Sequence, residues 1–149
     1  MLNQLIFASV TIVATLLVQV VFIGMAISRL SALSAWLQSG QTYFKRIVTL
    51  LALTLWVLAG LSVAVWIWAL LYLALGVFDA IEPAVYFSTV AFTTLGFGDI
   101  TLSDDWRLTS ALMAANGLLL FSLNTAFLIE VVRQLFRQAA ADNTAGHKL

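Results

Sequence analysis

The stretch Thr93-Thr94-Leu95-Gly96-Phe97-Gly98-Asp99 decides how the whole chain is interpreted. It lies between two long apolar runs, 47–78 and 108–132, which are candidate membrane spans. The order Thr-x-Gly-x-Gly alternates residues that tolerate left-handed backbone with residues that do not. Such alternation lets successive carbonyl groups point to one side. Four copies around an axis would then replace the water shell of a desolvated cation.

The composition is that of a membrane protein. Of the 149 residues, 62% are hydrophobic and 9% are charged, whereas soluble domains have about 25% charged residues. The net charge is zero, so we expect no nucleic-acid partner. The absence of cysteine excludes disulfides and thiolate metal sites, and the lone His147 lies in a polar tail. We therefore expect no cofactor.

The first apolar run predicts an N-terminal transmembrane helix over residues 1–28. Residues 5–28 exceed the roughly 20 residues that a helix needs to cross a bilayer. A cleaved signal peptide is the alternative, but no charge precedes the run and its apolar core is long. Gln19 is the polar exception, and we expect it to bond to a neighbouring helix rather than to a ligand.

Residues 29–46 are predicted to form a cytoplasmic interfacial linker. Leucines at positions 30, 33 and 37 have the spacing of an amphipathic helix face. We expect a short helix with Trp36 at the level of the lipid headgroups. Ser39-Gly40-Gln41 is expected to break it before the next span.

Basic residues predict the orientation, because they mark cytoplasmic loops. They lie after the first and third spans: Arg29, Lys45, Arg46, Arg133, Arg137 and Lys148. Between the second and third spans Arg107 is accompanied by five acids: Asp79, Glu82, Asp99, Asp104 and Asp105. We expect the N-terminus outside and the C-terminus in the cytoplasm of a multi-pass protein. The economy of the chain favours a prokaryotic plasma membrane.

Residues 93–99, together with the order of the elements around them, resemble the potassium channel family. The resemblance covers 47–137, a pore domain that would comprise an outer helix (47–78), a pore helix (83–93), a filter (94–99) and an inner helix (108–137). Pro83 suits the first turn of the pore helix. Gly76 marks the expected stop of the outer helix, and 138–149 would be a flexible cytoplasmic tail.

The resemblance implies a fold and a function. The fold is an all-α membrane protein with three transmembrane helices, a re-entrant pore helix and a selectivity filter, assembled as a homotetramer in the lipid bilayer. The function is passive and selective conduction of K⁺, with no enzymatic step. By this resemblance Thr94 supplies a hydroxyl and a carbonyl as the innermost K⁺ ligands. Leu95, Gly96 and Phe97 supply carbonyls above it, and Gly98 completes the ion-binding segment.

Residues around the filter depart from the family pattern. Thr93 and Asp99 flank it as support, but Phe97 stands where tyrosine is commoner and has no hydroxyl. The matching pore-helix residue, Phe87, has no donor, so we expect an apolar cuff of Phe87 against Phe97. Val90 occupies a place that is glutamate in some relatives. Tyr86 is expected to reach Asp99 and restrain the filter from outside.

The inner helix carries a set of residues on one face at spacings of three and four: Asn116, Gly117, Phe121, Asn124, Thr125 and Leu128. Gly117 resembles the glycine hinge of the family. Close packing against the outer helix explains Gly117 equally well.

Polar residues of the inner helix must avoid lipid, so each should face the pore or another helix. We favour Asn124 and Thr125 in the pore cavity over hydrogen bonds between helices. Glu130 either forms an acidic ring at the inner mouth or pairs with Arg133 three residues on.

Other functions stay open beside a potassium channel. One is a weakly selective monovalent cation channel, and another is a non-conducting structural or sensory membrane protein. The motif on its own is also compatible with a glycine-rich extracellular turn. The first two spans have no arginine at every third position, so the sequence does not predict a voltage-sensor helix. Gating by voltage at the filter, pH, lipid, tension or a separate regulatory subunit is equally compatible with the sequence.

Overall fold

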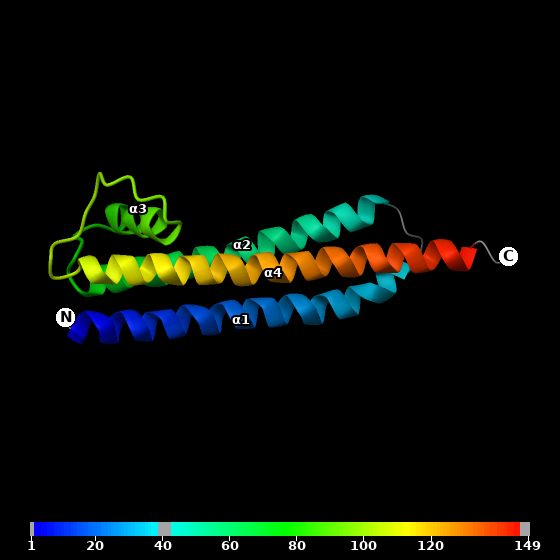
Figure 1. The fold of residues 1–149 in the computed structure, drawn as a ribbon, viewed down its shortest axis with the longest axis horizontal. Helices are drawn as coiled ribbons and strands as arrows, with labels where there is room; N and C mark the ends of the chain where they lie inside the picture. Colours follow the sequence, from blue (N-terminus) through cyan, green and yellow to red (C-terminus); the bar gives the residue numbers. More distant parts are fainter. Residues whose placement is uncertain (1, 39–42, 147–149) are drawn as a thin grey trace.

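The computed structural model describes residues 2–38 and 43–146, and all regular structure in this part of the chain is helical. The helices are α1 (Leu2–Gln38), α2 (Tyr43–Ala74), α3 (Ile81–Phe92) and α4 (Arg107–Gly146). The three long helices run alongside one another, and the short α3 lies at the end of the bundle that holds the N-terminus (Figure 1). The predicted all-α fold is confirmed.

The three long helices each contain a stretch that is long and apolar enough to cross a membrane. These stretches are Leu2–Arg29, Phe44–Ala74 and Arg107–Leu135. Large apolar side chains cover the outside of the bundle; Leu17, Leu51 and Leu119 are all more than half exposed. A solvent of lipid tails explains this surface, because lipid tails are as apolar as leucine.

α1 is longer than predicted. It continues without a break to Gln38, through residues that were expected to form a separate interfacial helix. No glycine or proline separates Arg29 from Gln38, so nothing in the backbone stops the helix. Its 37 residues extend about 55 Å, well beyond the hydrocarbon core. The expected break at 39–41 and the side chain of Trp36 lie outside the described residues.

The other helix ends follow from local sequence. α2 ends at Ala74, earlier than expected, and Gly76 closes it with a left-handed φ of 67°. Pro83 lies in the first turn of α3. α4 continues to Gly146, through residues 138–146 that were expected to be a flexible tail. The run of alanines at 139–141 accounts for the extension, because alanine is the best helix former.

α2 and α4 together connect α1 to α3. α1 contacts α2 and α4, and α3 contacts α2 and α4; within the described ranges α1 does not contact α3. α4 accordingly lies between α1 and α3 in Figure 1. The core around α3 consists largely of aromatic and long apolar side chains, among them Trp68, Tyr72, Phe87, Phe92, Met113 and Leu120.

The buried face of α1 is composed of small and polar residues. They are Gln4, Ala8, Thr11, Thr15, Gln19 and Ala26. Small residues let helix backbones approach closely, and polar side chains hydrogen-bond across helices where lipid offers no partner. α1 is therefore attached to the bundle by close packing and polar contacts rather than by burial of large apolar side chains.

Candidate functional site

The filter segment (94–99) leaves the end of α3 with an alternating backbone. Thr94, Gly96 and Gly98 have φ values of 60°, 57° and 77°, and the residues between them have negative φ. Glycine adopts this conformation freely, but a β-branched residue does so at a cost of roughly 1–3 kcal/mol. Thr94 is thus held in a strained conformation at the first turn of the segment.

Backbone N–H groups attach the filter segment to α3. Thr94 donates to the carbonyl of Ala91 at 3.0 Å. Leu95 and Gly96 both donate to the carbonyl of Val90, at 3.0 and 3.3 Å. In the part of the chain that the structure describes, no hydrogen bond is accepted by a carbonyl of residues 94–98. These oxygens are the free polar groups of the segment.

The filter segment is open to its surroundings on one side. Leu95 and Phe97 are 58% and 65% exposed. A pocket of about 570 Å³ lies on another side, lined by the segment, α3 and the first turns of α4. Non-helical backbone at membrane depth is tolerated only where it is buried in protein or lines water. The exposed side of this segment therefore calls for water or further protein beside it.

Tyr86 restrains the segment from α3, as expected. Its hydroxyl donates to Oδ2 of Asp99 at 2.7 Å. This hydrogen bond lowers the pKa of Asp99 below its ordinary value of 3.8, because it stabilises the carboxylate. It also raises the pKa of Tyr86, which must keep its proton to donate. The predicted contact is confirmed, and Asp99 is held as an anion beside the filter.

The expected cuff of Phe87 against Phe97 is not formed within one chain. Phe87 packs instead on Tyr72 and Phe78, with ring centroids 5.6 and 5.5 Å away. The contact is not formed because α2 supplies a buried aromatic partner, Tyr72, to Phe87, whereas Phe97 is largely exposed. Val90 is buried, and its carbonyl rather than its side chain supports the filter segment.

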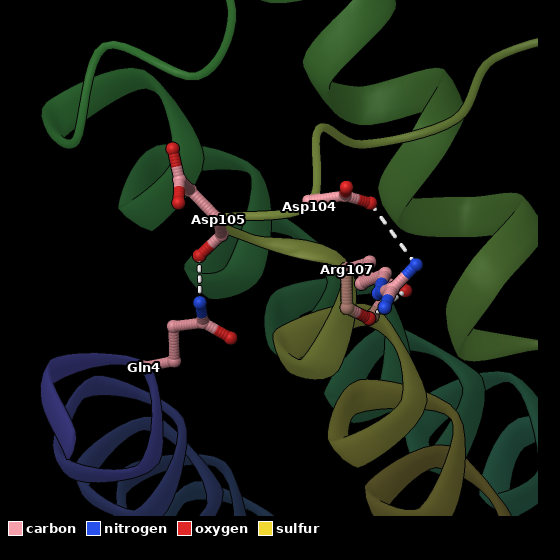
Figure 2. Close-up of polar contacts among 5 residues, drawn as sticks. Gln4, Asp104, Asp105 and Arg107 are labelled. Carbon is pink, nitrogen blue, oxygen red and sulfur yellow. Dashed lines mark hydrogen bonds and ion pairs between the residues drawn. The ribbon is translucent and has the colours of Figure 1, made fainter. Parts of the chain in front are cut away.

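The N-terminal end of α1 is tied to the loop between the filter segment and α4. Figure 2 shows Gln4 donating to the backbone carbonyl of Asp105, and Arg107 paired with Asp104 at 3.0 Å. The ring centroids of Phe7, in α1, and Trp106, in the loop, are 6.5 Å apart. The loop that follows the filter is thereby fixed to the start of α1.

Gly117 is the point of closest approach between α4 and α3. A Cβ atom at this position would lie 1.9 Å from the carbonyl oxygen of Phe92, the last residue of α3. Close packing was one of the two expected roles, but the neighbour is α3 and not α2. The hinge role of Gly117 stays a prediction.

The two asparagines of α4 bond to α1. Asn116 donates from Nδ2 to Oγ1 of Thr15 at 2.8 Å, and Gln19 donates from Nε2 to Oδ1 of Asn124 at 2.7 Å. Asn116 and Asn124 are 1% and 3% exposed. The prediction that Asn124 lines a cavity is wrong, because Gln19 gives it a partner on α1. The expected role of Gln19 as a helix–helix contact is confirmed. We call these four residues the α1–α4 seam.

The other inner-helix candidates lie on a different face of α4. Thr125 is exposed and donates to the carbonyl of Phe121 at 2.9 Å. Phe121 stacks near Phe92, with centroids 5.9 Å apart, and Leu128 is half-buried. Their cavity role stays a prediction. Glu130 accepts a hydrogen bond from Gln134 at 3.3 Å. Its alternative pairing with Arg133 is not formed among the described residues, and the acidic ring at the inner mouth stays a prediction.

Sequence reasoning missed Thr15 and Gly60. A Cβ atom at Gly60 would lie 2.7 Å from Oε1 of Gln19, so this glycine makes room for the seam on α2. The signal was the spacing of Thr11, Thr15 and Gln19, which recur every four residues on one face of a helix.

Comparison with known proteins gives one match. A family model described as an ion channel matches residues 60–134, just over half of the chain. The match spans part of α2, all of α3, the filter segment and α4 to Gln134, and it leaves α1 outside. No curated protein and no solved structure matches the chain.

Proposed function

This chain belongs to the ion channel family, and from that premise we propose that it is one subunit of a potassium-selective channel. Four copies would place their filter segments around a shared axis in a lipid bilayer. K⁺ would bind at Thr94, Leu95, Gly96 and Phe97 and pass down its electrochemical gradient without a cofactor or an enzymatic step.

The observation that carries the proposal is the backbone of the filter segment. Left-handed φ values at Thr94, Gly96 and Gly98 alternate with ordinary ones. The N–H groups of Thr94, Leu95 and Gly96 bond to α3, whereas the carbonyls of 94–98 accept no hydrogen bond within the described chain. Several free carbonyls on one short segment are suited to replace the water shell of a monovalent cation.

The surroundings of the segment support a cation as the occupant. α3 ends directly before it, so the negative end of the helix dipole lies beside the innermost ligand, Thr94. Asp99 is held as an anion at the other end of the segment. Both features raise the local concentration of cations and oppose the entry of anions.

The positions of the charged residues support the proposed orientation. The segment 93–106, which carries Asp99, Asp104 and Asp105, lies at the end of the bundle that holds α3 and the N-terminus (Figure 1). Arg29 lies near the other end of α1, and Arg133 lies far along α4. With basic residues in the cytoplasm, the N-terminus and the filter would face outside a prokaryotic plasma membrane.

The test is cation flux into liposomes that contain purified protein, with K⁺ and Na⁺ gradients compared. Gly96→Ala is the inactivating variant, because alanine is strained at a φ of 57°. Gly24→Ala is its matched control, since no atom lies within 4 Å of a Cβ there. K⁺ flux with little Na⁺ flux, lost only in Gly96→Ala, supports the proposal. A purified complex of four 16.2 kDa chains is the expected assembly.

A weakly selective monovalent cation channel is the second candidate. It is favoured by the sparse side-chain support of the filter segment, in which Tyr86 bonds to Asp99 but Val90 offers no polar side chain. Equal K⁺ and Na⁺ flux would select this candidate. The absence of flux under either gradient would favour a non-conducting structural or sensory role.

A further inference from the structure

We propose that α1 is a gating element, which holds α4 straight through the α1–α4 seam and thereby stabilises the closed channel. The inference rests on the proposed function, since gating requires a pore. It assigns a role to the helix that lies outside the family match. Thr15 and Gln19 are the positioning residues through which α1 acts on α4.

α1 follows α4 along most of its length. At the outer end Gln4 bonds to the backbone of Asp105. In the middle lies the seam, and toward the inner end Ala26 packs in one cluster with Val131 and Leu135. Because α1 does not contact α3 within the described residues, it reaches the filter segment only through α2 or α4, and the seam supplies the polar contacts with α4.

The seam holds α4 on both sides of its contact with the pore helix. Asn116 precedes Gly117, whose backbone touches the carbonyl of Phe92, and Phe92 lies two residues before Thr94. Asn124 lies two helical turns further on. A bend of α4 beyond Gly117 would move Asn124 relative to Asn116. The Gln19–Asn124 hydrogen bond, at 2.7 Å, must then break.

The chemistry of the seam suits a contact that opens and closes. Thr15 is fully engaged, because its hydroxyl accepts from Asn116 and donates to the carbonyl of Ile12 at 2.9 Å. By contrast, Gln19 Oε1, Asn116 Oδ1 and Asn124 Nδ2 are buried without partners among the described residues. Each amide is therefore satisfied on one side only. When one of these amides changes its hydrogen-bond partner, fewer buried polar groups lose a bond than would do so in a fully bonded network.

Gln19 is additionally fixed from α2. Its unpaired Oε1 lies against Gly60, where a Cβ atom would be 2.7 Å away. Trp56, one turn before Gly60, donates to the carbonyl of Phe22 at 2.9 Å. α1 is thus anchored to α2 next to the seam, and α4 is the partner that moves relative to it.

The experiment is single-channel recording in planar bilayers with K⁺ on both sides. Gln19→Asn removes one methylene and keeps the amide. The shorter side chain no longer reaches Asn124, whereas the buried side-chain area changes little. Interhelical hydrogen bonds in membranes correspond to roughly three- to twentyfold in an equilibrium. We expect the ratio of open to closed time to rise by about this factor, with unitary conductance and K⁺ selectivity unchanged.

Two further variants keep the test decisive. The reciprocal exchange Gln19→Asn with Asn124→Gln restores the combined length of the two side chains, and we expect it to restore the wild-type ratio. Thr15→Val removes the acceptor for Asn116 at constant shape, and we expect it to raise the ratio as well. Thr54→Val is the control, since Thr54 is exposed on α2 and bonds to the carbonyl of Leu50 in its own helix.

The outcomes separate the two proposals. The absence of single-channel currents in both the wild type and Gln19→Asn overturns the proposed function. Currents with an unchanged or lower ratio of open to closed time in Gln19→Asn overturn the gating role of α1. A change in unitary conductance also overturns it, because the residue would then act on the conduction path itself. Rescue by the exchange shows that the pairing, and not either side chain alone, sets the equilibrium.

Discussion

Replacement of Gly117 by alanine tests the central contact of the structure. The new Cβ atom would lie 1.9 Å from the carbonyl oxygen and 2.9 Å from the carbonyl carbon of Phe92. Ordinary contacts begin at 3.4 Å, so α4 and the end of α3 must separate by about 1.5 Å. Backbone atoms form the obstacle, and no side-chain rotation relieves it.

Two opposing effects determine how much Gly117→Ala changes the free energy of unfolding. Overpacking of this kind costs roughly 1–3 kcal/mol. Alanine regains up to about 1 kcal/mol over glycine within a helix. The net expectation is a loss of up to about 2 kcal/mol, together with a displaced filter segment, because Phe92 lies two residues before Thr94.

The assay is thermal unfolding in detergent, followed by the fluorescence of the five tryptophans. Gly24→Ala is the matched control, because its Cβ meets nothing within 4 Å and only the helix propensity changes. We expect Gly117→Ala to melt below the wild type and Gly24→Ala to melt at or above it. Equal stability of the Gly117→Ala variant, combined with altered gating, would refute the packing argument and support a hinge.

The remaining predictions concern three separate contacts. Gly60→Ala should displace Gln19 and raise the open probability measured in bilayers, as Gln19→Asn does; an unchanged open probability would show that the neighbouring helices absorb the clash. The hydrogen bond from Tyr86 stabilises the Asp99 carboxylate above pH 3.8, and this stabilisation is lost as the pH falls through the lowered pKa of Asp99. Tyr86→Phe should therefore raise the pH at which acid blocks the K⁺ current, toward pH 3.8. An unshifted midpoint in an external titration from pH 3 to 6 would remove Asp99 from the conduction path. Thr94→Gly should relieve the strain at a φ of 60° and raise thermal stability, but lower K⁺ selectivity by removing a ligand hydroxyl; retained selectivity in a Na⁺ competition assay would count against that role.

Features that depend on neighbouring residues could be predicted from the sequence. The spans follow from the length of the apolar runs, and the stop after α2 follows from Gly76. The turn at Gly96 and Gly98 follows from what glycine alone tolerates. The bond from Tyr86 to Asp99 links residues only 13 apart, which a short helix and a turn bring together.

Features that depend on partners far apart in the chain could not be predicted from the sequence. Asn124 and Gln19 are 105 residues apart, and a polar residue within a span avoids lipid equally well in a pore or against another helix. The spacing of polar residues along the helix is the same whether their face lines a pore or packs against another helix. Phe87 was assigned to Phe97 for the same reason, since the sequence does not show that Tyr72 of α2 and Phe78, after the end of α2, lie beside Phe87.

The seam also bears on how the chain enters the membrane. α1 is synthesised first and α4 last, so α1 can already span the bilayer when Asn116 and Asn124 arrive. Two asparagines oppose the insertion of an isolated helix, because lipid offers their amides no partner. Thr15 and Gln19 supply partners within the same chain. We therefore expect α1 to assist the insertion of α4, because a chain expressed without α1 would have to place two amides in lipid unaided.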